Sequence, residues 1–283
     1  MATASVPSTG LSRPSAGGWG RRNPKLHRFL HRGGLELVCV LVGGFALWAL
    51  LSGFIIPRPE RYLPSPVSVV LSSFDMLWKG LLPDFIWNTV WRLLIGSGLG
   101  LGIGIPFGIL LGLNRTVSDM FYPILNFFQS IAGIALLPIV MIWWGTSEQT
   151  VIFVILYTCL FPIAFNVLVG VRSIPRIYIN AMRTLGASRL RVARDVILPG
   201  ALPSIATGAR LGIGFGWRAV IAGEMLAGRR GLGWMIFTAQ QVDLTAQVIL
   251  GMVMIGLMWI TLDRYLLRPL EADTIQRWGL VQR

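Results

Sequence analysis

Three arginines stand out among the side chains that could do chemistry in this chain. Arg92, Arg210 and Arg218 each lie inside a long apolar run. An ionisable group at membrane depth is costly, and it usually has an opposite charge beside it or a function. One interpretation is that these arginines extend toward the lipid headgroups or pair with Glu224 or Asp263. The other is a path for a small anion, because a guanidinium matches the oxygens of carboxylate, sulfonate and nitrate.

The remaining reactive residue types have no catalytic or metal-binding spacing. His27 and His31 are four residues apart but have no acidic partner near them in the sequence, and Cys39 and Cys159 fall inside apolar runs as packing residues. The sequence contains no G-x-x-x-x-G-K-[ST] loop for a nucleotide. We therefore expect a chain that is not an enzyme, with no catalytic, metal-binding or cofactor-binding residue.

The composition is that of an integral membrane protein. Of the 283 residues, 54% are hydrophobic and only 13% are charged, whereas soluble domains carry about 25% charged residues. The mean hydropathy is +0.67. The net charge of +13 comes from arginines that flank apolar segments, which indicates membrane topology and not nucleic-acid binding.

Apolar runs long enough to cross a bilayer, which takes about 20 residues, predict an all-α fold with about six transmembrane helices. The expected spans are residues 35–56, 88–113, 120–143, 150–171, 201–223 and 246–267. Three other parts complete the expected organisation. Residues 1–34 would be a mobile cytoplasmic arm, and 268–283 a cytoplasmic tail. Residues 57–87, which contain LPSPVSVV (Leu63–Val70), would be a periplasmic segment with an extended Pro-rich entry followed by a short surface helix.

The basic residues predict the orientation. With the N-terminus inside, 17 of the 25 lysines and arginines fall on the inner side, 5 on the outer side and 3 within spans. An excess of Lys and Arg marks the cytoplasmic side. We therefore expect both termini in the cytoplasm.

Glycines predict where the helices pack. Gly96, Gly100, Gly104, Gly108 and Gly112 repeat every four residues, and a second series begins at Gly208. Small residues at this spacing let helices approach closely in lipid. Kinks are expected at the prolines within spans, namely Pro106, Pro123, Pro138 and Pro162.

The most informative stretch is the polar segment Asn180–Pro199, which lies between apolar runs on the expected cytoplasmic side. Its pattern predicts a hairpin of two helices. Residues 176–185 form the first, with Ser173 as a possible cap, and Gly186 ends it in a left-handed conformation. Ser188 caps the second, which Pro199 ends. Leu190, Ala193 and Ile197 would give the second helix one apolar face.

This segment resembles the cytoplasmic EAA loop of ABC-importer permeases, whose pattern is roughly E-A-A-x-x-x-G-A followed by a closing I-x-L-P. The matching positions here are Asn180, Ala181, Met182, Gly186, Ala187, Leu198 and Pro199, with Ile197 directly before Leu198. Two departures are Asn180 where the family has an acidic residue, and Met182 where it has alanine. LPSPVSVV, Ala135–Gly145 and Ala222–Ile236 resemble the permeases for nitrate, taurine and aliphatic sulfonates. The resemblance covers about residues 60–270.

The resemblance implies a MetI-like, type I importer permease in the bacterial inner membrane. It implies a second permease copy, cytoplasmic ATPases that bind ATP and Mg²⁺ and grip the loop, and an external substrate-binding protein. Arg210, Arg218 and Glu224 are the candidates for a translocation path. Glu148 and Glu224 are expected near the outer surface, as solvated charges or as contacts for the binding protein. A secondary transporter or channel without ATPases, and a membrane-embedded enzyme, are the alternatives.

Overall fold

The computed structural model describes residues 43–44, 46–52, 63–269 and 271, and every regular element among them is helical. The chain divides at Leu50 into two compact units, which we describe separately. In the first unit, residues 43–44 and 46–50 are helical and belong to the expected span 35–56. The rest of that unit, including the arm 1–34, lies outside the described residues, as does nearly all of the tail 268–283.

The second unit begins with a short helix and a very long one. Helix α3 spans Pro66–Trp78, and Ser65 caps it by accepting a hydrogen bond from the Ser68 backbone N–H at 3.2 Å. The predicted short helix is therefore present, and it begins inside LPSPVSVV, at Pro66. Helix α4 then runs over Leu81–Leu113, so it begins seven residues before the expected start of the second span.

The expected span 120–143 is not one straight helix. Helix α5 (Arg115–Ser130) is followed by a 3₁₀ turn, η2 (Gly133–Leu136), and helix α6 (Leu137–Trp144), and the two halves meet at 81°. Glycine is required at the break, because a Cβ at Gly133 would overlap the Thr158 hydroxyl oxygen on α7. Pro138, expected as a kink, occupies the first turn of α6 instead, where its missing N–H costs nothing.

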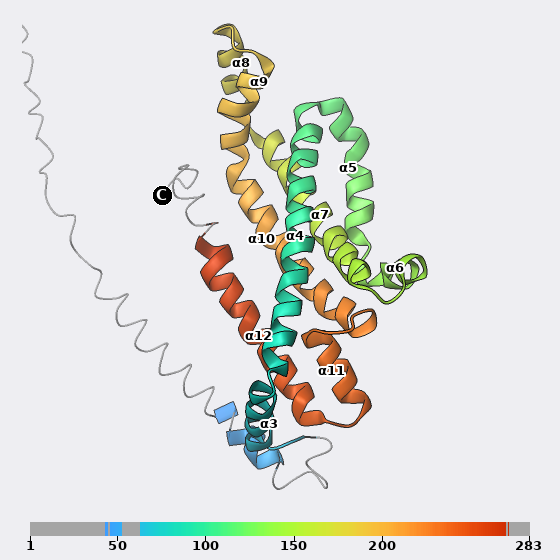
Figure 1. The fold of residues 1–283 in the computed structure, drawn as a ribbon. Helices are drawn as coiled ribbons and strands as arrows, with labels where there is room; N and C mark the ends of the chain where they lie inside the picture. The colour runs from blue at the N-terminus through green and yellow to red at the C-terminus, as the bar shows by residue number, and fades with distance from the viewer. Residues whose placement is uncertain (1–42, 45, 53–62, 270, 272–283) are drawn as a thin grey trace, which may run out of the picture. The chain divides into compact units, whose positions relative to one another are not determined.

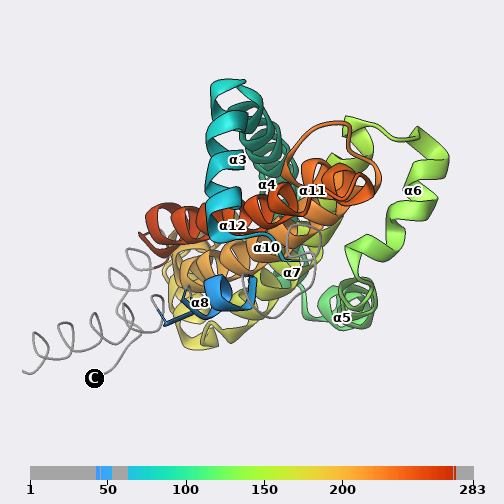
Figure 2. The same ribbon diagram turned by 90° about the horizontal axis from the view of Figure 1, so that it is seen from below.

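The remaining elements follow in order. They are α7 (Glu148–Ser173), α8 (Arg176–Thr184), α9 (Arg189–Val192), the π segment η3 (Ala193–Ile197), α10 (Leu198–Leu226), α11 (Leu232–Gln241), α12 (Thr245–Leu262) and the π segment η4 (Asp263–Leu267). Figure 1 shows α4, α7 and α10 side by side, with the short helices α8 and α9 at one end of α10. In Figure 2, α5 and α6 lie on one side of the α7–α10 pair and α12 on the other. Four described helices are long and apolar enough to cross a membrane, and the bent α5–α6 pair makes up to five.

Helix α7 is the packing centre, because both glycine series close onto it. A Cβ at Gly100 would lie 2.7 Å from the Cys159 Cβ, and one at Gly216 on α10 would lie 2.5 Å from the Cys159 sulfur. Real Cβ atoms do not approach that closely, so only glycine lets α4 and α10 lie against α7. Cys159 is buried and free, which confirms it as a packing residue. The close-packing role predicted for the glycine ladder is also confirmed.

Candidate functional site

The first candidate site is the helical hairpin formed by α8 and α9. The Ala187 N–H donates to the Met182 carbonyl at 3.0 Å and the Gly186 N–H to the Arg183 carbonyl at 3.0 Å, which closes the end of α8. Gly186 has φ of +78°, as this left-handed ending requires. Ser188 then starts α9 by accepting from the Arg191 N–H at 3.3 Å. The predicted ending at Gly186 and the cap at Ser188 are confirmed, whereas Ser173 donates to the Gly170 carbonyl and caps nothing in α8.

The second helix of the hairpin does not stop at Pro199. It continues through η3 into α10, so that Arg189–Leu226 is one helix of 38 residues. In η3 the Leu198 N–H donates to the Ala193 carbonyl, five residues back, and this wider turn accommodates the proline that follows. The π turn also changes the buried face. Val192 and Ile197, five apart, are buried, whereas Leu190 is 80% exposed, so the predicted apolar face is wrong at Leu190.

The hairpin presents apolar side chains that nothing in the described chain covers. None of the residues of α8 is buried. Ile177 is 71% exposed, Tyr178 58% and Leu185 83%. Among the residues matched to the EAA pattern, the exposed ones are Asn180, Ala181, Gly186 and Leu198, and the half-buried ones are Met182, Ala187 and Pro199. Met182 and Ala187 pack against the core and anchor the hairpin to it.

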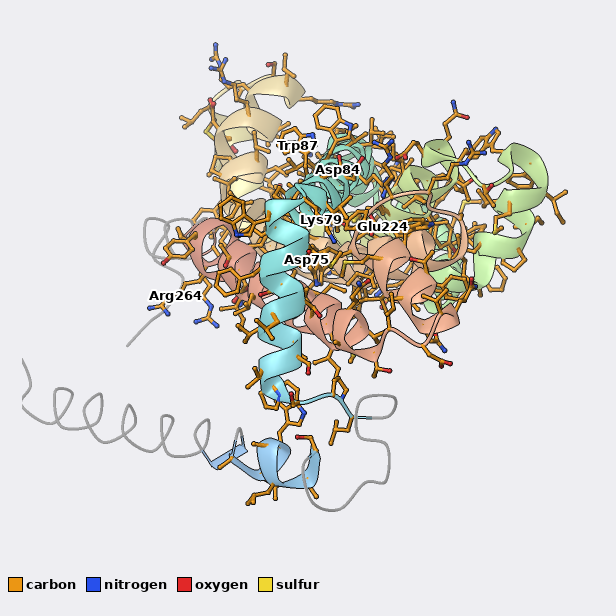
Figure 3. All side chains as sticks on the ribbon, turned by 60° about the horizontal axis from the view of Figure 1, so that its bottom comes forward. Asp75, Lys79, Asp84, Trp87, Glu224 and Arg264 are labelled. Atoms are coloured by element: carbon orange, nitrogen blue, oxygen red, sulfur yellow. The ribbon has the colours of Figure 1, made fainter. Side chains whose placement is uncertain are left out.

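At the other end of the long helices, Arg92 and Glu224 form a buried ion pair, which the sequence had offered as one interpretation. The Arg92 Nη1 lies 2.6 Å from the Glu224 Oε1, and both side chains are at most 1% exposed. Glu148 accepts from the Nε and Nη2 of Arg92 at 2.5 and 2.6 Å. Glu224, labelled in Figure 3, is therefore not the solvated charge expected for it.

The hydrogen bonds of Glu224 tie three helices and a turn together. Its Oε2 accepts from the Thr89 hydroxyl at 3.0 Å and from the Gly233 N–H at 2.9 Å. The Thr89 hydroxyl oxygen in turn accepts from the Leu232 N–H at 3.0 Å, and Arg92 donates to the Arg230 carbonyl at 2.5 Å. The network thus joins α4, α10, the turn before α11 and the start of α11, while Glu148 adds the N-terminus of α7. Such complete pairing is what makes buried charges tolerable.

The three candidates for a translocation path do not share one site. Arg210 pairs with Asp263 at 2.9 Å and with Glu271, so its charge is matched by the last described turns of the chain. Glu224 belongs to the buried network. Arg218 has no carboxylate within ion-pair distance among the described residues, and its guanidinium lies 5.6 Å from the centre of the Phe215 ring.

Arg218 lines a cavity of about 310 Å³ at the break between α5 and α6. Helices α7 and α10 supply its other walls. Its aromatic lining was not predicted, namely Phe128, Tyr157, Phe161 and Phe215. Tyr157 and Phe161 are one helical turn apart on α7, with ring centres separated by 4.9 Å. Aromatic residues one helical turn apart are also typical of ordinary core packing. Only the break between α5 and α6 beside them shows that these rings line a cavity.

Comparison with known proteins decides the family. Residues 104–263 match the family model described as "Binding-protein-dependent transport system inner membrane component". The chain belongs to this family.

Curated relatives of the permease are similar over most of their length. It is 33% identical to the taurine transport system permease protein of Escherichia coli, over 82% of this chain and 84% of the relative. It is 34% identical to the bicarbonate transport system permease protein of Synechococcus elongatus, over 99% of both chains. It is 32% identical to the nitrate import permease protein of Synechocystis, over 72% of this chain and 78% of the relative.

A solved structure confirms the fold of the permease. An inward-facing structure of the MetNI methionine ABC transporter is similar with a TM-score of 0.54 and 25% identity, covering 69% of this chain and 98% of that chain. The expected MetI-like, all-helical fold is therefore confirmed. The permease is a multi-span transport protein of the inner-membrane type.

Proposed function

We propose that this chain is the membrane subunit of an ATP-driven importer, and that the α8–α9 hairpin is the surface where a cytoplasmic ATPase docks. The observation that carries the proposal is the exposed apolar surface of the hairpin. Ile177, Leu185 and Leu190 are each more than 70% exposed. The hairpin lies on the side that the basic residues assign to the cytoplasm, so lipid does not cover these side chains. Several exposed apolar side chains on one short hairpin at such a place favour a protein partner.

The construction of the hairpin suits the transmission of force. Gly186 and the hydrogen bonds around it fix the angle between α8 and α9. From α9 onward the backbone is one helix of 38 residues that packs along α7. A push on the hairpin would therefore tilt α10 as a unit. ATP and Mg²⁺ would bind to the ATPase, and this chain would bind no cofactor and catalyse no reaction.

Membership of the same family supports a proposal for the assembly and the substrate. We propose two copies of this permease in the bacterial inner membrane, with both termini in the cytoplasm and an external binding protein delivering the substrate. Its curated relatives are named for taurine, bicarbonate and nitrate. These solutes share negatively charged oxygens, so we propose a small anion as substrate. Of the path candidates, Arg218 is the one whose charge the described residues leave unmatched, while Arg210 and Glu224 remain candidates whose charges are paired in this conformation.

The coupling role is tested with two glycines of the same backbone conformation. Gly186 has φ of +78° and Gly80, before α4, has φ of +68°, and a Cβ at either position meets nothing within 4 Å. A β-branched residue strains both turns similarly. In membranes containing the permease and its ATPase, we expect Gly186→Val to abolish transport-coupled ATP hydrolysis, whereas Gly80→Val retains it.

A second variant separates docking from backbone strain. Leu185→Ser removes an 83%-exposed apolar side chain without changing any buried contact, so the fold should persist while co-purification of the ATPase falls. Equal ATPase recovery and coupling in wild type, Gly186→Val and Leu185→Ser would refute docking at the hairpin. Substrate uptake by the permease without any ATPase would favour a secondary transporter or channel instead.

A further inference from the structure

The cavity beside Arg218 has an unusual distribution of polar groups. At about 310 Å³ it is at the small end of the range for ligand pockets, about 300–1,000 Å³. Phe128, Phe161 and Phe215 give it aromatic walls, and Arg218 is the only charged side chain among the described residues that line it. The cavity therefore combines one cation with a largely apolar lining.

The hydroxyl groups around the cavity already donate their protons elsewhere. The Tyr157 hydroxyl donates to the Phe128 carbonyl at 2.7 Å, and the Thr158 hydroxyl to the Val154 carbonyl at 2.7 Å. The Ser130 hydroxyl donates to the Phe127 carbonyl at 2.7 Å. A hydroxyl carries a single donor proton, so these groups offer none to a ligand. Among the lining side chains, Arg218 and the Gln129 amide are the donors that remain.

A cavity with so few free side-chain donors, one of them a cation, suits a ligand with a single anionic head. An inorganic oxyanion such as nitrate is hydrated on all sides in water, and most of its hydrogen bonds would be lost against aromatic rings. A ligand with an apolar tail would lose only the hydration of its head, which the Arg218 guanidinium replaces with charge-assisted bonds. The tail would gain by leaving water for the aromatic walls.

Arg218 also differs from the other arginines that lie within these spans. Arg92 and Arg210 each have carboxylate partners, whereas the described residues supply none for Arg218. Its recorded contact is the face of Phe215, which holds the guanidinium beside the cavity. A bound anion would complete the pairing that the other two already have.

We infer that this cavity is a binding site within the membrane part of the permease for an organic anion with an apolar body, of the alkyl or aryl sulfonate or carboxylate class. The inference rests on the proposed importer function and narrows its substrate class. Arg218 binds the anionic head, and the rings of Phe128, Phe161 and Phe215 surround the tail. Inorganic oxyanions are poor ligands for this site.

The test uses the purified full-length permease in lipid nanodiscs and a series of straight-chain sulfonates from methanesulfonate to butanesulfonate, with nitrate and bicarbonate for comparison. Affinity is read by calorimetry. Each methylene should raise affinity about fourfold, so butanesulfonate should bind about sixtyfold more tightly than methanesulfonate. Arg218→Gln should weaken butanesulfonate binding about tenfold to a hundredfold. Phe215→Leu, which keeps apolar volume but removes the ring beneath the guanidinium, should weaken it less.

The outcomes separate this inference from the importer proposal. Nitrate or bicarbonate binding at Arg218 as tightly as butanesulfonate would overturn the organic-anion class. Binding that is unchanged in Arg218→Gln, or absent for every anion, would overturn the site itself. Dissociation of the permease dimer in Arg218→Gln would assign the arginine to the contact between subunits and also overturn it. None of these results affects the ATPase coupling of Gly186→Val against Gly80→Val, which tests the importer function separately.

Discussion

Replacing Arg92 with glutamine should unfold the permease at a markedly lower temperature, because it leaves Glu224 as a buried carboxylate without its counter-charge. Glu224 is 0% exposed and would keep only its hydrogen bonds from Thr89 and Gly233. Removing one partner of a buried ion pair costs about 3–5 kcal/mol. An ordinary hydrogen bond between membrane helices is worth much less, on average about 0.6 kcal/mol. The two free energies differ enough for one measurement of stability to show whether Arg92 acts as a buried counter-charge or as an ordinary hydrogen-bond donor.

The expected shift follows from the size of the folded unit. For a domain of about 150–250 residues, 1 kcal/mol moves the melting temperature by about 2–4 °C. A loss of about 3–5 kcal/mol therefore lowers the Tm of Arg92→Gln by about 6–20 °C. The matched control is Asp75→Asn, which breaks the ion pair with Lys79 on α3 (Figure 3). Both side chains of that pair are more than half exposed, so it is worth about 0–1 kcal/mol and the control should stay close to wild type.

The double variant Arg92→Gln with Glu224→Gln tests the cause of the loss. If the unpaired charge destabilises the protein, neutralising Glu224 should restore part of the Tm, and the two changes will not be additive. Thermal unfolding of detergent-purified protein, followed by intrinsic tryptophan fluorescence, gives the Tm of wild type, Arg92→Gln, Glu224→Gln and the double variant. A Tm for Arg92→Gln within about 2 °C of wild type would correspond to about 1 kcal/mol or less and refute the reasoning. A strictly additive double variant would do so as well.

Two further predictions concern packing and capping. Gly100→Val places a Cβ 2.7 Å from Cys159 and should prevent stable folding, whereas Gly98→Val on the same helix meets nothing within 4 Å and should fold; monodisperse elution in size-exclusion chromatography distinguishes them, and equal behaviour would contradict the packing of α4 on α7. Ser188→Ala removes the cap of α9 and should cost about 1 kcal/mol, loosening the hairpin locally; amide hydrogen exchange should rise at Arg191 first, and unchanged exchange there would count against the cap.

The sequence alone predicts much of the architecture because the responsible signals are local. Apolar length predicts the spans, and four long helices and a bent pair are found where five of the six were expected. The four-residue glycine repeat predicts a face of close approach, and that face is where α4 packs on α7. Gly186 and Ser188 predict the ends of the hairpin helices from the backbone conformation and hydrogen bonds that those residue types allow.

Other features depend on neighbours that are distant in sequence. The close approach of Thr158 on α7 to Gly133 at the break cannot be seen in the sequence, where Pro138 was expected only to kink the span. Pro199 predicts the end of the second hairpin helix, yet the π turn before it lets that helix continue into α10. Tertiary packing can offset the free-energy cost of a π turn, and that packing cannot be seen in the sequence alone.

The polar sites, too, are partly predictable from the sequence and partly determined by tertiary packing. The sequence by itself determines that the chain is a multi-span membrane protein with a capped helical hairpin between two apolar runs, because composition, span length and capping are properties of consecutive residues. Only the tertiary structure decides which charges are matched. Arg92 and Glu224 are 132 positions apart, and they meet because α4 and α10 lie against the same central helix. The same packing leaves Arg218 beside a cavity without a carboxylate partner in the described chain, and Coulomb interactions depend on distance in space, not on distance along the chain.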